Sequence, residues 1–431
     1  MPVPSFLPTE LIAEIFVKLM KTETLRQRDL RTLAHLCLVS KRFLPFARQE
    51  LYRAISLKIV EPSPEEYYYC HSYRIPQAKP SRDSLLLAAT LKASPEIADL
   101  VGTLLLDLAD RAGGEGAQIV KEVLTACPRI TEVEIARFSH DEGEGGDSFA
   151  AALSLGKNIR IVHTAGVSAH PHGTLMSVLF DFDLQELHLV NQHFGDAVTF
   201  PFPSFQLRSY THLYQDDRGF QPILSASHQS LRTLHIFSTG EAFDLTPFRN
   251  LMTLQYECHM HEGATSQDII STLSTLPPSL ASLSLHSVYW SRHEPAEEEL
   301  AHNAELGARR VLHSLPDSLR YLNLRNFLLS PDYILDFIAS PTACPNLRRL
   351  IVPTTLADED AKELPRFEAE MQAERRKTYD VPWMKAYSDE EVARAERYIA
   401  EQEQDEFGFG LEGEARKACD ARGIRMISGA E

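Results

Sequence analysis

Apolar residues recur along the middle of the chain with the spacing L-x-x-L-x-L, in which the first, fourth and sixth positions are mostly aliphatic. Clear copies begin at Leu184, Leu231, Leu280, Leu319 and Leu347, and weaker copies begin at Val101, Ile130, Ile159, Leu207 and Leu251. Side chains alternate in direction along a β-strand, so the fourth and sixth positions of each copy would face the same side of a sheet. The pattern therefore predicts a short strand in every copy.

The stretches between these copies have helical character. We expect helices over residues 84–94, 117–126, 266–275, 297–313 and 332–340. Turn signals such as Cys127-Pro128 separate helix from strand, and a first strand is expected at residues 54–59. Units of helix, turn and strand that recur about every 20–30 residues resemble leucine-rich repeats. This resemblance implies a solenoid with a parallel sheet on its concave side and helices on its convex side.

The turn after each strand departs from the leucine-rich-repeat pattern. The asparagine that usually stands three residues past the last strand leucine is replaced by Thr239, Val288 and Phe327. We therefore expect an irregular solenoid over residues 53–356. The alternative is an ordinary α/β domain whose strands happen to be rich in leucine.

Residues 1–52 have the pattern of three short helices. Pro8 suits the first helical position, and the second and third helices are expected around Leu36 and after Pro45. Three helices of this length bury little apolar surface by themselves. The segment therefore needs either the rest of the chain or a partner to cover its apolar side.

The residues of this N-terminal segment resemble an F-box, in the order Leu7-Pro8-x-Glu10-Leu11-Ile12-x-Glu14-Ile15-Phe16-x-x-Leu19, then Leu38-Val39-Ser40-Lys41-Arg42-Phe43 and Leu51-Tyr52-Arg53. Phe43 stands where many members have tryptophan, and Ser40 where many have cysteine. The resemblance implies a Skp-type adaptor as partner and, through it, a cullin-RING ubiquitin ligase. The residues expected to contact the adaptor are Leu7, Pro8, Leu11, Ile15, Val39 and Phe43. Alternatively, these side chains pack the helices against the repeats.

The repeat pattern stops at about Ala357, and residues 357–431 are rich in Glu, Ala, Lys and Arg. A last helix is expected at residues 412–422 and a short strand at residues 424–427. A polar cap on the last repeat is the natural role for this segment, and a solvated acidic tail is the alternative. The predicted fold is thus α/β: a three-helix F-box, an irregular leucine-rich-repeat solenoid and a helical C-terminal cap.

Charge, cysteine spacing and hydropathy limit which partners and which cellular compartment we expect for this chain. The chain has 431 residues and a formal net charge of -17, which disfavours non-specific binding to nucleic acid. The six cysteines are scattered without C-x-x-C spacing, which is typical of reduced thiols in a cytoplasmic or nuclear protein. The N-terminus lacks the basic region of a signal peptide, and no apolar stretch is long enough to span a bilayer. We expect no membrane partner.

The sequence carries no recognisable catalytic or metal-binding motif. Gly113-Gly114-x-Gly116 lacks the Lys-Ser/Thr of a phosphate-binding loop, so an ordinary loop is expected there. His170-x-His172 and His259-x-His261 have no further ligands nearby in the sequence. We expect no catalytic residues, no metal and no cofactor, although residues from separated loops can form an active site that sequence does not reveal.

The function expected from these patterns is substrate recognition for an SCF-type ubiquitin ligase. An unknown target protein would bind the exposed side of the sheet, through one row containing His188, His235 and Asn323 and a second row containing Phe237, His286 and Arg325. Trp290 lies in a long insertion and is a further expected contact. The alternatives are an F-box protein that acts outside degradation and an enzyme with an unrecognised site on a repeat scaffold.

Overall fold

The computed structural model divides the chain into two compact units, Met1–Leu231 and Arg232–Glu431. This division falls inside the predicted repeat region rather than near residue 52 or 356. The structure describes residues 35, 37–38, 41, 44–60, 78–108, 114–136, 144–165, 168–169, 178–190, 193–194, 203–213, 221–238, 242–259, 266–288, 309–326, 331–340, 342–352 and 411–428.

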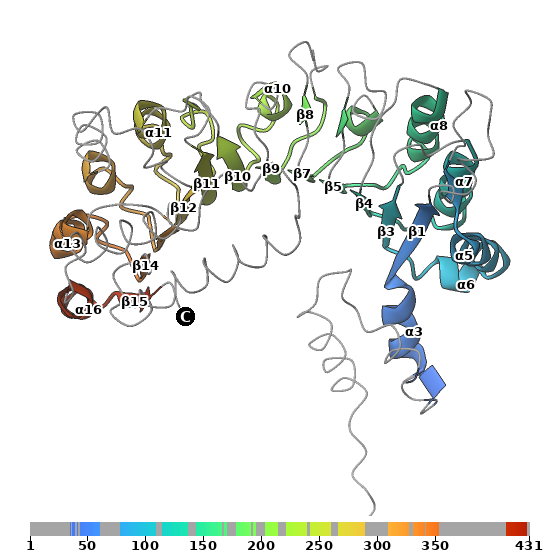
Figure 1. The fold of residues 1–431 in the computed structure, drawn as a ribbon, viewed down its shortest axis with the longest axis horizontal. Helices are drawn as coiled ribbons and strands as arrows, with labels where there is room; N and C mark the ends of the chain where they lie inside the picture. The colour runs from blue at the N-terminus through green and yellow to red at the C-terminus, as the bar shows by residue number, and fades with distance from the viewer. Residues whose placement is uncertain are drawn as a thin grey trace, which may run out of the picture. The chain divides into compact units, whose positions relative to one another are not determined.

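The first unit alternates helices with strands of a mainly parallel sheet (Figure 1). Its elements are α3 (Leu44–Arg53), β1 (Ala54–Val60), β2 (Lys79–Pro80), α5 (Arg82–Ala93), α6 (Pro95–Ala98), β3 (Thr103–Asp107), α7 (Gly114–Ala126), β4 (Glu132–Ala136), α8 (Glu144–Leu153), β5 (Ile161–Ala165), β6 (Ser168–Ala169), β7 (Glu186–Val190), β8 (His193–Phe194), β9 (Ser209–Leu213) and α10 (Gln221–Leu224). The strand order is β9-β7-β5-β4-β3-β1-β2, in which only the β1–β2 pairing is antiparallel. A separate parallel pair joins β6 to β8.

The second unit repeats this architecture. Its elements are β10 (Thr233–Ser238), β11 (Thr253–His259), α11 (Ser266–Leu273), β12 (Ser282–Val288), β13 (Tyr321–Asn326), α13 (Pro331–Ala339), β14 (Arg349–Val352), α16 (Leu411–Ala421) and β15 (Arg425–Ser428). The strands follow one another in sequence order from β10 to β15, and all pairs are parallel. A strand is present at every L-x-x-L-x-L copy, so the prediction of an α/β chain with a parallel sheet built from successive repeats is confirmed.

The fourth and sixth positions of the copies form the core on one face of each sheet. In the second unit the register aligns Leu254, Leu283 and Leu322, and all three side chains are fully buried. The first unit has the same arrangement, with Leu104 beside Val133. Burying one such side chain stabilises the fold by about 1.5–3 kcal/mol, so these rows dominate the stability of each repeat.

A recurring hydrogen-bond pattern sets the register where most of the strands begin. The carbonyl of Gly102 accepts from the backbone amides of both Thr131 and Glu132, at 2.9 and 3.2 Å. The carbonyl of Arg232 accepts in the same way from Met252 and Thr253, both at 2.9 Å. Because one carbonyl holds two consecutive amides of the next repeat, a slip by one residue would break both bonds and expose the core side chains.

Polar side chains form a further series of bonds between neighbouring repeats. The residue directly before the first leucine of a copy donates to a backbone carbonyl of the preceding repeat. The bonds run from Ser230 to Leu207, Ser279 to Leu251, Ser318 to Leu280, Asn158 to Pro128 and Asn346 to Asp317, at 2.6–2.8 Å. These bonds satisfy turn carbonyls in a solenoid whose usual asparagine position is occupied by other residues.

The glycine-rich stretch does not form the expected loop. Gly114 begins α7, and Gly116 lies in its first turn. A β-carbon at Gly116 would lie 2.6 Å from Cδ1 of Ile59 in β1. Gly116 therefore has a packing role, because it lets the start of α7 approach the first strand closely.

The chain end confirms the expected last helix and strand. α16 and β15 occupy residues 411–421 and 425–428, and β15 pairs with β14 so that Met426 lies beside Leu350. The C-terminal segment thus adds one more strand to the sheet of the second unit, which covers the edge of β14. Residues 353–410 lie outside the described residues, so the choice between cap and tail stays open for them.

Arg422 ties this last strand to the preceding repeat. Its guanidinium donates to the carbonyls of Phe337 and Ile338 in α13, at 3.4 and 2.9 Å, and to those of Ala343 and Cys344 in the following turn. The last carbonyls of a helix have no partner within the helix, and a cation there also interacts favourably with the helix dipole. One side chain therefore satisfies both the end of α13 and the turn that leads to β14.

We predict that Arg422→Ala lowers the free energy of unfolding by about 1–3 kcal/mol, because partly buried carbonyls lose a charged donor. Urea unfolding measures this change. Lys417→Ala is the matched control, since Lys417 is an exposed cation on α16, and its effect should stay within about 0.5 kcal/mol. Equal unfolding midpoints for the two variants would show that Arg422 does not hold the chain end in place.

Candidate functional site

The second unit presents a row of polar side chains on the sheet face opposite the buried leucines. The register places His235, Gln255, Ser284 and Asn323 beside one another on successive strands, and each is half-buried. The predicted row is therefore present in this unit, and Asn323 and His235 belong to it. A half-buried polar row on a sheet face offers hydrogen-bond donors and acceptors to a protein partner.

Glu257 organises the β10–β11 part of this face. Its Oε1 lies 2.8 Å from Nε2 of His235 and accepts from Nε2 of Gln255 at 2.9 Å. The same carboxylate thus holds two neighbouring side chains in fixed orientations. Because fewer rotamers must be ordered when a partner binds, such a network lowers the entropic cost of binding.

The first unit carries a pair of stacked imidazoles on the corresponding face. The rings of His163 and His188 lie 4.3 Å apart at an interplanar angle of 7°, because β5 and β7 pair these two residues directly. Nδ1 of His188 lies 2.8 Å from Oγ1 of Thr211. On the other side of the pair, Nε2 of His163 lies 3.5 Å from Oε1 of Glu132.

His188 was expected on this face, whereas His163 was missed. The copy that contains His163 is weak, because Thr164 rather than leucine occupies its sixth position. The available signal was the position itself: His163 stands between the fourth and sixth positions, as His188 does in its own copy.

The expected second row is only partly correct. Phe237 lies in register with Glu257, but its ring is only 8% exposed. Phe237 is therefore buried rather than exposed on this face, and its role as a target contact stays a prediction. The β12–β13 register shifts between Ser284 and His286, so that His286 pairs with Asn326 rather than with Arg325.

The remaining expected contacts cannot be placed. The side chains of His286 and Arg325 lie outside the described residues, as does Trp290. The same holds for the expected adaptor contacts Leu7, Pro8, Leu11, Ile15, Val39 and Phe43. Their roles stay predictions from the sequence.

The third helix of the F-box-like segment is described and is joined directly to the repeats. α3 ends at Arg53 and β1 begins at Ala54. The carbonyl of Arg53 accepts from the amide of Gly102 at 2.9 Å, Ala47 is fully buried, and Arg48 lies 3.6 Å from Glu96 of α6. α3 is therefore part of the folded body of the first repeat.

No protein-family model matches this sequence, and a search of curated proteins found no match. Among solved structures, the chain is similar to one described as "Crystal structure of TLR13-ssRNA13 complex", with 14% sequence identity over 60% of this chain and 37% of that chain. The TM-score is 0.32, which is too low to support an argument. The repeat architecture therefore rests on the strands and register described above.

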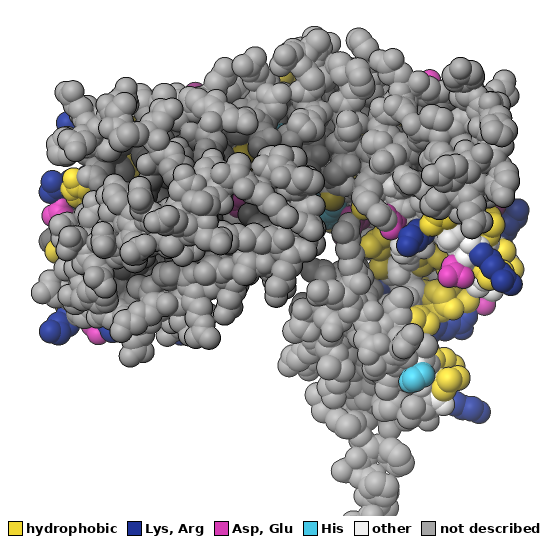
Figure 2. Space-filling model, viewed as in Figure 1, with side chains coloured by type: hydrophobic (Ala, Val, Ile, Leu, Met, Phe, Trp, Pro, Cys, Tyr) yellow, Lys and Arg dark blue, Asp and Glu magenta, His cyan; other side chains and the backbone are white. Residues whose placement is uncertain are grey.

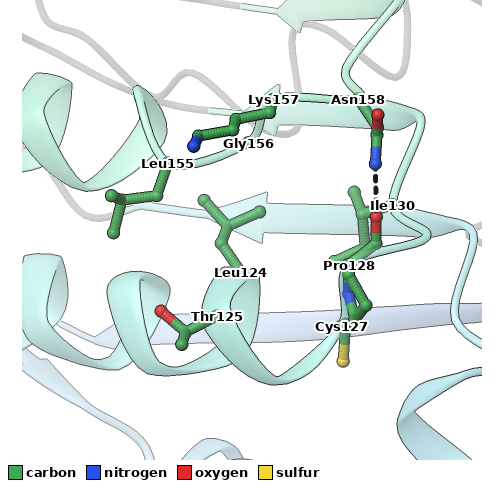
Figure 3. Close-up of a pocket in the computed structure, with 9 residues that line it drawn as sticks. All are labelled: Leu124, Thr125, Cys127, Pro128, Ile130, Leu155, Gly156, Lys157 and Asn158. Atoms are coloured by element: carbon green, nitrogen blue, oxygen red, sulfur yellow. Dashed lines mark hydrogen bonds between the residues drawn. The ribbon is translucent and has the colours of Figure 1, made fainter.

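A pocket of about 310 Å³ lies between the end of α7 and the turn that follows α8 (Figure 3). Its wall is formed by Leu124, Thr125, Cys127, Pro128, Ile130, Leu155, Gly156, Lys157 and Asn158. The bond from Asn158 to the Pro128 carbonyl spans one end of the pocket (Figure 3). The pocket is thus a crevice between adjacent repeats, with an apolar wall rather than a set of converging acid and base groups.

Exposed leucines lie on the helical side of the first unit. Leu85 and Leu86 of α5 are 54% and 57% exposed, and Figure 2 shows hydrophobic side chains over α5 and α6. Two half-exposed leucines cover far less than the roughly 800 Å² that each partner contributes to a stable interface. This strip alone therefore does not define a docking site.

The described chain offers few reactive groups. Burial raises the pKa of Cys127 to about 11, with a further contribution from Asp99. Burial likewise raises the pKa of Cys344 to about 12 and that of Cys419 to about 11. In the part of the chain that the structure describes, no three His, Cys, Asp or Glu side chains gather where they would hold a metal ion, and no helix is long and apolar enough to cross a membrane.

We predict that the thiols of Cys127, Cys344 and Cys419 react slowly with Ellman's reagent at pH 8. Only the thiolate reacts, and a pKa of about 11–12 leaves less than about 1% of each thiol ionised. Alkylation followed by peptide mass mapping would identify each residue, and the same protein unfolded in guanidinium provides the control. Labelling at the unfolded rate would show that these thiols are accessible and ionised in the folded protein.

Proposed function

We propose that this chain is the substrate-recognition subunit of an SCF-type cullin-RING ubiquitin ligase. In this proposal the N-terminal helices bind a Skp-type adaptor, and the polar sheet faces bind a target protein. The F-box resemblance of residues 1–52 supports the first part. The ordered rows of His, Gln, Asn and Glu side chains support the second, because they offer many hydrogen-bonding groups on a rigid parallel sheet.

The direct connection between α3 and β1 carries this proposal. A recognition subunit promotes ubiquitin transfer by holding its target near the charged enzyme, which raises the effective concentration of the reacting groups. Such a subunit needs a stiff link between adaptor and target surfaces. Here Arg53 ends the helix, Ala54 starts the strand, and the Arg53 carbonyl is bonded to Gly102 of the next repeat.

In this proposal the chain itself performs no bond chemistry and contributes recognition. The side chains on the exposed sheet face hydrogen-bond to one another, as Glu257 does to His235 and Gln255. Groups held in this way are suited to recognition, because they present fixed donors and acceptors to a partner. The bond-forming steps would belong to the other subunits of the ligase.

We predict that replacing Leu7 and Pro8 by Ala weakens adaptor binding by about 1–3 kcal/mol, as expected for central apolar contacts. Isothermal titration calorimetry of the purified chain with the Skp-type adaptor measures this. Leu85→Ala is the control, because it removes an exposed leucine from α5 outside the F-box-like segment. Unchanged affinity in a folded Leu7→Ala/Pro8→Ala variant would rule out the F-box assignment.

We predict that target binding depends on the polar sheet face. The target is the protein that copurifies with the chain, adaptor and cullin and accumulates when the proteasome is inhibited. His188→Gln and Asn323→Ala should each weaken its binding by about 1–2 kcal/mol if these residues are central contacts.

Gln118→Ala is the matched control for this surface, since Gln118 is exposed on α7 and bonds only to Glu122 of the same helix. The control should bind target as the unmodified chain does. If Gln118→Ala abolishes binding while both sheet variants retain it, recognition takes place on the helical side. Turnover of a small substrate by the purified chain would favour an enzyme instead.

A further inference from the structure

Four arginines lie at or directly before the first residues of the last strands of the second unit. Arg349 and Arg425 are the first residues of β14 and β15 and pair directly in the register. Arg320 and Arg348 immediately precede β13 and β14, and the amide of Arg348 donates to the Arg320 carbonyl at 2.9 Å. All four side chains are exposed. We call these residues the arginine patch.

No carboxylate neutralises the arginine patch among the residues that the structure describes. The nearest described acids in the sequence, Asp317 and Asp420, form no ion pair with it. Some described arginines outside the patch are paired with acids, as Arg309 is with Asp336 at 2.6 Å. The chain has a net charge of -17, so a group of arginines without acidic partners among the described side chains differs clearly from the overall charge.

This arrangement is unfavourable for the folded chain by itself. Neighbouring strands lie about 4.8 Å apart, and like charges directly opposite each other destabilise a sheet. Arg349 and Arg425 are such a pair. Packing does not require positive charge at these exposed positions. Binding of an anion would explain why arginines occupy them.

Tyr321 holds part of the patch in place. Cζ of Arg349 lies 5.4 Å from the centre of the Tyr321 ring, and the two residues pair across β13 and β14. A guanidinium stacked on an aromatic ring keeps its N–H groups in the plane available as donors. Arg349 is therefore oriented for hydrogen bonding to a planar acceptor such as a carboxylate.

We propose that the arginine patch binds a carboxylate-rich segment of a protein partner. Guanidinium groups match carboxylates with two parallel hydrogen bonds. The patch spans three strands, or about 10 Å, and side chains on one side of an extended peptide recur about every 7 Å. Two or three acidic residues at alternate positions would therefore reach it. A nucleic acid is disfavoured, because its continuous negative charge would meet the acidic remainder of the chain.

Binding of an acidic segment to the arginine patch does not depend on the F-box assignment. The inference rests on the proposed function only where it makes the bound protein a ubiquitination target.

The probe is a fluorescein-labelled decapeptide of alternating Glu and Ser, and a Gln-Ser peptide is the neutral comparison. Fluorescence anisotropy with the full chain should show tighter binding of the acidic peptide. This preference should weaken between about 50 and 200 mM salt, because salt screens exposed charges.

Arg348→Gln/Arg425→Gln should weaken binding of the acidic peptide about three- to tenfold, as expected when two exposed ion pairs are lost. Arg232→Gln is the matched control: Arg232 is also exposed and immediately precedes a strand, but it lies at β10, and its replacement should leave binding unchanged. The double variant should melt no lower than the unmodified chain, because the substitution removes repulsion. Adaptor binding, measured on the same samples, separates failure of this proposal from failure of the proposed function.

Equal affinity of the double variant and the unmodified chain, or equal affinity for the acidic and neutral peptides, would overturn the proposal. A phosphoserine peptide that bound at least tenfold tighter than the acidic one, with the same dependence on the arginines, would replace carboxylate by phosphate as the ligand. Tighter binding of a single-stranded RNA decamer would identify a nucleic-acid site instead. If the double variant fails to fold, the single variant Arg425→Glu provides the same comparison.

Discussion

The bifurcated hydrogen bond at the start of most strands of the two sheets is the constraint on which the rest of this structure depends. One carbonyl, such as that of Gly102 or Arg232, accepts two consecutive amides from the next repeat. This fixes the register of parallel neighbours residue by residue. With the register fixed, the leucines of successive copies form buried rows, and the residues between them form rows on the opposite face. Core and recognition surface are therefore two consequences of one backbone arrangement.

The turns that precede the strands supply hydrogen bonds between repeats that lack the usual asparagine ladder. The position that usually carries a ladder of asparagines is occupied by residues such as Val288 and Phe327. Here the residue before the first leucine makes the bonds between repeats instead, as Ser279 and Ser318 do. The serine hydroxyl is shorter than an asparagine amide, but it still reaches the backbone carbonyl of the preceding repeat, because that carbonyl lies at a fixed distance. Repeats of unequal length can therefore stack.

Functionally, the two units present different chemistry on similar scaffolds. The first has stacked imidazoles at His163 and His188. The second has a network around Glu257 and an arginine patch at the start of its last strands. A parallel sheet built from repeats permits this variety, because the exposed residues do not contribute to the core. A partner that contacts several of these groups would be recognised by the order of its charges and hydrogen-bonding groups.

The sequence by itself determined where the strands of the repeats lie, though not the two-residue strands β2, β6 and β8, because aliphatic spacing repeats along the chain and each repeat strand needs only local alternation to bury one face. It also indicated α3, α5, α7, α11, α13, α16 and the final strand β15. The expected adaptor contacts rest on the sequence alone.

Only the tertiary structure decided which exposed positions are available. Phe237 is covered, the shift between β12 and β13 moves Arg325 out of its row, and Arg349 meets Arg425 across a gap of more than seventy residues. The reason is physical: burial and charge contacts on a parallel sheet are made between strands, and the distance between strands in the sequence carries no information about which side chains meet.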